Sequence, residues 1–147
     1  MKSKEHWEKV YTAKAPDNVS WFQPHAEMSM RLIHDTGLGC DAAIIDVGGG
    51  ASTLVDDLLD DGYRALTVLD LSAAALNETL RRLGTKGESV RWMEADITQA
   101  VFEPYSFDVW HDRAVFHFLT TDEDRKAYVK QVLRALKPGG HVIMATF

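Results

Sequence analysis

Short apolar runs alternate along this chain with segments whose apolar residues recur at helical spacing. Runs bounded by glycine, proline or polar residues predict buried strands, and the longer periodic segments predict amphipathic helices. Strands and helices in alternation, with connections long enough for right-handed crossovers, predict a doubly wound, mostly parallel α/β sheet with helices on both faces. The predicted strands are 42–47, 64–70, 89–94, 107–110 and 141–147, and the predicted helices are 4–12, 25–35, 52–62, 72–82 and 121–136.

Polar and glycine residues mark the ends of the predicted helices. Ser52 and Ser72 are expected to cap two helix N-termini, and Thr121 opens a sequence that resembles a capping box. Gly84 stands where a C-cap glycine belongs, and residues 137–140 are expected to separate the last helix from the last strand. The residues expected to face the core are Met28, Leu32 and Ile33, then Leu54, Val55, Leu58 and Leu59, and then Tyr128, Val129, Val132, Leu133 and Leu136.

Composition and charge narrow the class of protein. The 147 residues suffice for one domain, and the formal net charge of −6 disfavours a nucleic-acid backbone as a partner. The single cysteine, Cys40, excludes an internal disulfide and a cysteine-rich zinc site, and the histidines lack metal-ligand spacing, so we expect no metal. The charged N-terminus is followed by neither an apolar signal segment nor a membrane-spanning run, which predicts a cytoplasmic protein without a membrane partner.

A glycine loop follows the first predicted strand. That strand ends in Asp46, and Gly48, Gly49 and Gly50 come next, before a predicted helix. A strand that turns through glycines into a helix brings the backbone close to a nucleotide-like ligand. No lysine follows the glycines, which disfavours a triphosphate loop, and Thr53 stands where a dinucleotide fingerprint has its third glycine.

The acid before the glycines bears on the choice of ligand. Asp46 would repel a pyrophosphate, whereas S-adenosylmethionine carries an ammonium and a sulfonium, and a carboxylate attracts the ammonium directly or through water. Backbone N–H groups of the loop can bind the cofactor's own carboxylate. Asp70, after the second predicted strand, is placed to accept both ribose hydroxyls, which would suit NAD equally. Asp96 is placed to accept the adenine amino group, with Leu71 and Ile97 on either side of the ring.

These residues together make the chain resemble a class I S-adenosylmethionine-dependent methyltransferase over about residues 42–147. The matching segments, in the family's order and spacing, are Ile45–Gly50, Leu69–Leu71, Glu94–Ile97, Phe107–Val109 and Leu136–Gly140. The resemblance implies S-adenosylmethionine as methyl donor, S-adenosylhomocysteine as product, and a small-molecule or protein side-chain nucleophile as acceptor. The implied cofactor residues are Asp46, Gly48, Gly49, Gly50, Ser52 (where many members have a further glycine), Asp70, Leu71, Ala95, Asp96 and Ile97.

Two other functions stay open at this point. One is a non-catalytic domain that binds S-adenosylmethionine without transferring its methyl group. The other is an NAD-linked oxidoreductase, which Asp46 and the missing third glycine disfavour. Among acceptors, a small molecule fits a short chain without an inserted recognition domain best, and a protein lysine is the second possibility.

The N-terminal segments 6–11 and 19–23 are similar to the lead-in of small bacterial methyltransferases, and more distantly to the thiopurine and tellurite-type enzymes. In such relatives this region folds over the cofactor, which implies cofactor contacts for Trp7, Tyr11 and Trp21. Packing of these aromatic side chains on the sheet is the alternative. The resemblance divides the single domain, 1–147, into a helical cap over 1–40 and a core over 41–147.

The segment after the fourth predicted strand supplies the substrate-side candidates His111, Asp112 and Arg113. Ligands bind at the carboxyl ends of the strands in open α/β sheets. In the family this position borders the transferable methyl group, which implies that His111 also lies at the cofactor. We expect His111 to serve as general base and Asp112 to orient it, while a salt-bridged loop is the alternative.

The chain ends after its fifth predicted strand, whereas the family's sheet has seven. We therefore expect a sheet truncated after strand 5, lacking the C-terminal strands. An apolar strand at an open edge invites pairing with another chain, so an oligomer formed through the strand-5 edge is a further possibility.

Overall fold

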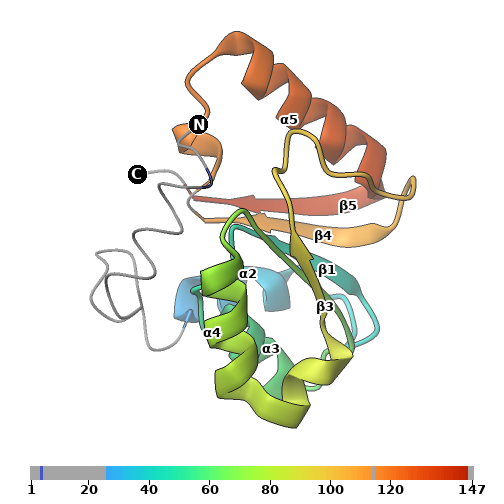
Figure 1. The fold of residues 1–147 in the computed structure, drawn as a ribbon. Helices are drawn as coiled ribbons and strands as arrows, with labels where there is room; N and C mark the ends of the chain where they lie inside the picture. The colour runs from blue at the N-terminus through green and yellow to red at the C-terminus, as the bar shows by residue number, and fades with distance from the viewer. Residues whose placement is uncertain (1–3, 5–25, 114, 146–147) are drawn as a thin grey trace.

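A computed structural model describes residues 4, 26–113 and 115–145 of the chain. Its five strands form one parallel sheet in the order β3-β2-β1-β4-β5. In Figure 1, α5 covers one face of this sheet, and α2, α3 and α4 cover the other, which confirms the predicted doubly wound fold. The strands are β1 Ala43–Val47, β2 Ala65–Asp70, β3 Arg91–Glu94, β4 Phe107–Asp112 and β5 Leu136–Met144, and the helices are α2 Glu27–Asp35, α3 Leu54–Asp60, α4 Ala73–Leu83 and α5 Asp122–Ala135, with short 3-10 turns η2 Gly84–Ser89 and η3 Phe116–Phe118.

Successive residues of the central strands serve two separate cores, because side chains alternate between the faces of a sheet. Ile44 of β1 packs with α2, α3 and α4, whereas Ile45 packs toward α5. β4 divides in the same way between Val109 and Trp110, both fully buried. The central strands are therefore buried on both faces, which is why they read as continuous apolar runs.

The chain reverses direction across the sheet at β1, which lies between β2 and β4. From β1 the chain first adds β2 and β3 on one side of it, and then crosses over to add β4 and β5 on the other side. In open parallel sheets such a switch leaves a crevice at the carboxyl ends of the two central strands. In this chain those ends are Asp46–Val47 of β1 and His111–Asp112 of β4.

Three strands have a boundary that lies two or more residues from the sequence-based expectation. β4 continues to Asp112, because His111 and Asp112 still pair with Asp46 and Val47 of β1. β3 starts at Arg91 rather than 89, because Ser89 is the last residue of η2 and Val90 is its C-cap. β5 starts at Leu136 rather than 141, since Leu136 is already extended (ψ 135°) and pairs with Phe107 across an irregular register. The Lys-Pro-Gly-Gly segment thus lies within β5, where Gly139 adopts φ +79°.

The helix ends follow the sequence in part. The hydroxyl of Ser72 accepts from Ala75 N, and that of Thr121 accepts from Asp124 N, so both predicted caps are confirmed. The expected cap at Ser52 is wrong, because Thr53 occupies the N-cap of α3 and the Ser52 hydroxyl instead accepts from Leu54 N at 3.0 Å. Residues 95–106 connect β3 to β4 without a helix.

The predicted apolar faces are right for α3 and wrong in part for α2 and α5. Leu54, Val55 and Leu58 are buried as expected. Leu133 of α5 is 70% exposed and Met28 of α2 is 60% exposed, and Val129 and Leu32 are exposed as well. α5 lies beside β5, an edge strand whose Val142 and Met144 are also exposed, whereas α2 turns Ser29 and Ile33 inward in place of Met28 and Leu32.

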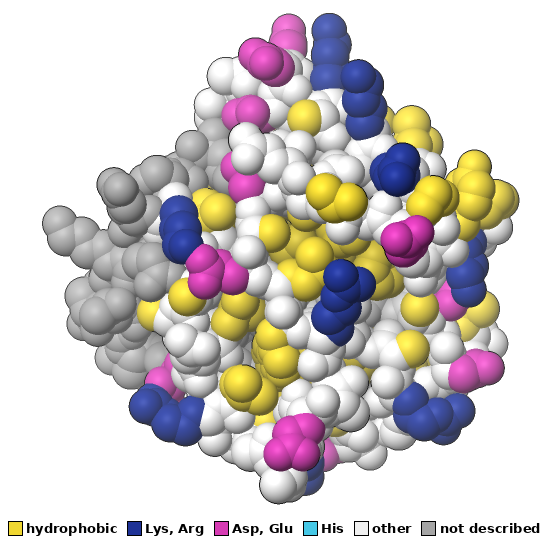
Figure 2. All heavy atoms as spheres, turned by 45° about the vertical axis from the view of Figure 1, so that its right-hand side comes forward, with side chains coloured by type: hydrophobic (Ala, Val, Ile, Leu, Met, Phe, Trp, Pro, Cys, Tyr) yellow, Lys and Arg dark blue, Asp and Glu magenta, His cyan; other side chains and the backbone are white. Residues whose placement is uncertain are grey.

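The face of the molecule in Figure 2 mixes both signs of charge. Lysine and arginine side chains alternate there with aspartate and glutamate, and hydrophobic side chains gather between them. Among the side chains described on this face, no continuous basic surface of the kind that binds a phosphate backbone is visible. Within the described ranges, no helix combines the length and the apolar character that crossing a bilayer requires.

Candidate functional site

Two buried carboxylates lie beneath the glycine loop. Asp46 is the last residue but one of β1 and Asp70 is the last residue of the neighbouring strand β2, and both are almost completely inaccessible. The loop packs directly on them: a Cβ on Gly49 would lie 2.1 Å from Asp46 Oδ2, and one on Gly50 would lie 2.8 Å from Asp70 Oδ2. Since real Cβ atoms do not approach other atoms so closely, a side chain at either position would force the carboxylate beneath it to shift.

Asp70 joins the end of β2 to the glycine loop. Its Oδ2 accepts from Gly50 N and its Oδ1 from Ser72 N, each at 2.9 Å. Burial raises the pKa of Asp70 to about 6; backbone hydrogen bonds from Ser72, Gly50 and Leu71 oppose this effect and the nearby charge of Asp46 adds to it. Each carboxylate oxygen has a second lone pair, so the group can still accept hydroxyl donors.

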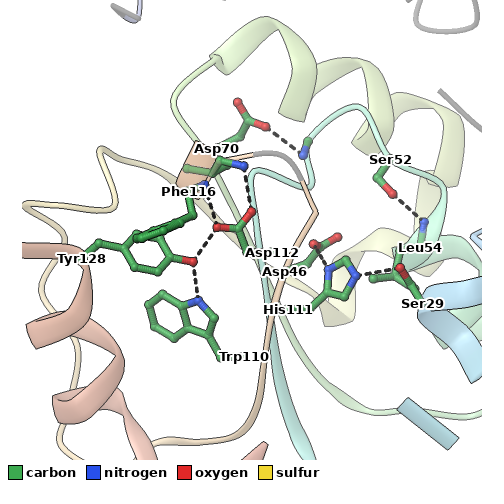
Figure 3. Close-up of polar contacts among 12 residues, drawn as sticks. Ser29, Asp46, Ser52, Leu54, Asp70, Trp110, His111, Asp112, Phe116 and Tyr128 are labelled. Atoms are coloured by element: carbon green, nitrogen blue, oxygen red, sulfur yellow. Dashed lines mark hydrogen bonds and ion pairs between the residues drawn. The ribbon is translucent and has the colours of Figure 1, made fainter. Parts of the chain in front are cut away.

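Asp46 is held on one side only. Its Oδ1 lies 2.8 Å from His111 Nδ1, and His111 Nε2 lies 2.8 Å from the hydroxyl of Ser29. Figure 3 shows the imidazole between these two groups, which come from β1 and α2. The other carboxylate oxygen of Asp46, Oδ2, is buried and has no hydrogen-bond partner in the part of the chain that the structure describes.

Asp112 turns to the opposite face of the sheet from His111, as Figure 3 shows. It accepts hydrogen bonds from Val115 N at 2.7 Å, from Phe116 N at 3.0 Å and from the hydroxyl of Tyr128. Trp110 Nε1 donates to the same hydroxyl at 2.9 Å. Burial raises the pKa of Tyr128 above its ordinary value, and the charge of Asp112 and its hydrogen bond to the hydroxyl raise it further.

This geometry corrects one expectation. The sequence predicts that Asp112 orients His111, but neighbouring residues of a strand point to opposite faces, and Asp46 holds the imidazole instead. Asp112 anchors the loop after β4, in which Val115 packs where a Cβ of Gly48 would be. Arg113 is the residue after β4 and is partly exposed.

The remaining cofactor candidates lie at the end of β3 or near it. Ala95 N donates to Asp70 O at 3.0 Å, which ties this segment to β2. Asp96 Oδ1 accepts from Thr98 N at 2.9 Å, and Leu71 is partly exposed. Ile97 is 2% exposed and packs in the core under α5, and its contact with the adenine ring stays a prediction.

Two residues of the buried networks were not predicted from the sequence. Ser29 contacts His111 and Tyr128 contacts Asp112. Ser29 could have been found only if the sequence had shown which face of α2 is buried, and the apolar spacing predicts that Met28 lies on that face instead. The predicted Trp7, Tyr11 and Trp21 lie outside the residues that the structure describes. No group of potential metal ligands occurs within the described residues.

Comparison with known proteins matches the strand-and-loop region. A family model described as "Methyltransferase domain" matches residues 44–140. The chain is 26% identical over 141 residues to the human (Homo sapiens) eEF1A lysine and N-terminal methyltransferase, covering 96% of this chain and 20% of that protein. It therefore spans about a fifth of the length of that relative.

Two further likenesses cover most of the chain. The chain is 27% identical over 158 residues to EEF1A lysine methyltransferase 2 of Danio rerio, covering 98% of this chain and 68% of that protein. Phosphoethanolamine N-methyltransferase 2 of Haemonchus contortus, solved with phosphomonomethylethanolamine and S-adenosylhomocysteine, shares the fold with a TM-score of 0.66 at 22% identity. That likeness covers 81% of this chain and 28% of the nematode enzyme.

Proposed function

This chain belongs to the methyltransferase domain family, and on that basis we propose that it transfers a methyl group from S-adenosylmethionine to a small-molecule or protein side-chain nucleophile. The observation that carries the proposal is the pair of buried carboxylates, Asp46 and Asp70, under a glycine loop at the switch point of the sheet. Asp46 is the more informative of the two, because its Oδ2 is a buried acceptor without a donor among the described residues.

The hydrogen-bond acceptors of the site fit S-adenosylmethionine group by group. The α-ammonium supplies N–H donors for Asp46 Oδ2, which otherwise costs the fold about 1–3 kcal/mol as an unsatisfied acceptor. The ribose hydroxyls supply donors for the free lone pairs of Asp70. The cofactor carries no phosphate that Asp46 would repel, and this separates it from NAD.

Methyl transfer makes modest demands on the protein. When bound, S-adenosylmethionine supplies an electrophilic methyl group on a sulfonium, whose departure as a neutral thioether needs no acid. The chain's own residues must hold the cofactor's polar groups and exclude water along the in-line approach of the nucleophile. A general base is needed only for an acceptor that arrives protonated.

His111 suits a positioning role better than the base role that the sequence predicts. Its Nδ1 faces a carboxylate, which can only accept, so the proton of neutral His111 resides on Nδ1. Its Nε2 then accepts from the hydroxyl of Ser29, and the imidazole is 3% exposed. Acting as a base toward a substrate would require the Ser29 hydroxyl to move away first.

The proposed acceptor is a small molecule or a protein lysine. The names of two relatives, both lysine methyltransferases acting on eEF1A, support the lysine, and the nematode enzyme's complex with a phosphorylated amine supports a small amine. A lysine side chain and a small amine both present an amine nucleophile. The residues proposed to bind the methyl donor are the same for either acceptor.

A methylation assay tests the proposal. The protein is incubated with methyl-labelled S-adenosylmethionine and a cell extract divided into small-molecule and protein fractions. Label entering either fraction supports the proposed reaction and identifies the acceptor class. Binding of S-adenosylhomocysteine without label transfer to either fraction would favour the non-catalytic binding domain.

A further inference from the structure

We propose that Ser29 and His111 are positioning residues for the cofactor: together they fix the plane of the Asp46 carboxylate, so that Oδ2 meets the α-ammonium. This inference rests on the proposed function, since it assumes that S-adenosylmethionine or its product occupies the site. It adds a residue of α2, outside the segment matched by the family model, to the cofactor machinery.

The three groups form one continuous buried chain of hydrogen bonds. Asp46 Oδ1, the His111 ring and the Ser29 hydroxyl are joined by two hydrogen bonds of 2.8 Å each. Asp46 and His111 are ladder partners on β1 and β4, so their side chains leave the sheet next to each other on the same face. Ser29 reaches them from α2, which packs on that face.

α2 turns Ser29 toward the sheet and leaves two large apolar side chains exposed. Met28 and Leu32 are exposed at 60% and 41%, whereas Ser29 is 7% exposed. A helix that buries a hydroxyl in place of two large apolar side chains gives up hydrophobic burial. In return, this orientation brings the Ser29 hydroxyl within hydrogen-bond distance of the imidazole.

Fixing one oxygen of a carboxylate fixes the direction of the other. With Oδ1 held by His111, the carboxylate plane cannot turn without breaking that bond. Oδ2 then lies against the Cα of Gly49, in the glycine loop, and is left without a partner among the described residues. A cationic N–H donor from the ligand's amino-acid tail completes this acceptor, and a charge-assisted bond of this kind is stronger than a neutral one.

The test compares two ligands that differ in that tail. S-Adenosylhomocysteine carries the α-ammonium, whereas 5′-methylthioadenosine keeps the adenosine and thioether and lacks the amino-acid part. Titration calorimetry on the full chain measures both affinities for wild type, Ser29→Ala and His111→Asn. The control is His34→Asn, on the same helix as Ser29, which breaks the exposed pair that His34 forms with Asp61 after α3.

We expect Ser29→Ala and His111→Asn to weaken S-adenosylhomocysteine binding by about tenfold. The reason is that a carboxylate of Asp46 that is no longer held in one plane forms a weaker charge-assisted hydrogen bond with the α-ammonium. Binding of 5′-methylthioadenosine is expected to change by less than about twofold, and His34→Asn to change neither affinity. Ser29→Thr keeps the hydroxyl and is expected to restore the preference for the ligand with the tail.

Equal weakening of both ligands would show a purely structural role for Ser29 and His111, and unchanged affinity for both ligands would show no role; either result overturns the inference. If His111→Asn unfolds, Ser29→Ala decides the matter alone, because it removes one oxygen atom and adds no volume. Failure of wild type to bind S-adenosylhomocysteine would contradict the proposed function itself. Failure of the inference alone looks different, because wild type then binds the ligand and the variants do not distinguish the two ligands.

Discussion

The carboxylate of Asp70 accepts a hydrogen bond from the backbone nitrogen of Gly50 at 2.9 Å, so the end of β2 holds the glycine loop that follows β1. The same carboxylate is the proposed acceptor for the ribose hydroxyls. One acid thus shapes the loop and is also the proposed contact of the ribose. Substitutions at Asp70 and Gly49 are therefore expected to change both ligand binding and stability.

Replacing Asp70 with alanine is expected to weaken S-adenosylhomocysteine binding by well over tenfold. Hydrogen bonds to a charged acceptor contribute about 1.5–3 kcal/mol, and the substitution also frees Gly50 N from its partner. Titration calorimetry measures the affinity. The control is Asp60→Ala, which removes an exposed acid of α3 and is expected to leave the affinity unchanged. Equal effects of the two variants would contradict a ribose contact at Asp70.

The affinity for S-adenosylhomocysteine is expected to fall at acidic pH. The pKa of Asp70 is raised to about 6, so protonation below that pH removes an acceptor that the ribose hydroxyls need. The affinity should fall by up to about tenfold per pH unit below this value. Calorimetry between pH 5 and pH 8 in roughly half-unit steps measures the profile. A matching slope in Asp70→Asn would assign the pH dependence to another group.

The stability of the ligand-free protein is expected to depend on pH in the opposite direction to the affinity. Because the pKa of Asp70 is higher in the folded state than its ordinary value of 3.8, Asp70 contributes stability that is fully present below pH 3.8 and lost as the pH rises through about 6. Denaturant unfolding should therefore show Asp70→Asn gaining on wild type by up to about 3 kcal/mol between those limits. A constant difference across this range would contradict the raised pKa.

Adding a methyl group to Gly49 is expected to abolish binding and destabilise the fold. The new Cβ would lie 2.1 Å from Asp46 Oδ2, in a carboxylate that His111 holds in place. Overpacking of this kind costs about 1–3 kcal/mol, which thermal unfolding detects. Gly39→Ala is the matched control, since its Cβ would meet only the side chain of exposed Asp41 at 3.3 Å. Wild-type affinity in Gly49→Ala would show that the loop does not sit on Asp46.

Removing the hydroxyl of Tyr128 is expected to destabilise the protein by about 1–3 kcal/mol. That hydroxyl donates to Asp112 and accepts from Trp110 Nε1, so Tyr128→Phe leaves a buried indole N–H without its partner. Denaturant unfolding measures the change. Tyr105→Phe, at a tyrosine that is 56% exposed, is expected to have no effect. Equal stability of the two variants would contradict a structural role for the network.

The sequence predicted the parts of this molecule that depend on local patterns. The ends of β1 and β2 and the glycine loop could be located because each of these two strands is a short apolar run that stops at an acid or a glycine. Asp46 and Asp70 followed from this, since parallel strands bring their carboxyl ends to one edge of the sheet. The caps at Ser72 and Thr121 followed because an N-cap bond spans only a few residues.

Contacts between distant segments could not be predicted in this way. Ser29 meets His111 across 82 positions of sequence, and no local signal sets a buried serine apart from an exposed one. The direction of Asp112 was missed because β4 runs two residues farther than its apolar run, which leaves the alternation of its last residues unassigned. Leu136 reads as helical from spacing alone, but pairing with Phe107 extends its backbone into β5.

Calorimetric titration of the wild-type chain with S-adenosylhomocysteine, and separately with NADH, tests the central claim most directly. Binding to the native state also raises the thermal midpoint, which provides a second measure of the same equilibrium. The proposed site predicts saturable binding of S-adenosylhomocysteine at one site, with a raised midpoint, and no heat from NADH. Tight binding of NADH, or no binding of S-adenosylhomocysteine at pH 7.5 (about 1.5 units above the pKa of Asp70), would contradict it.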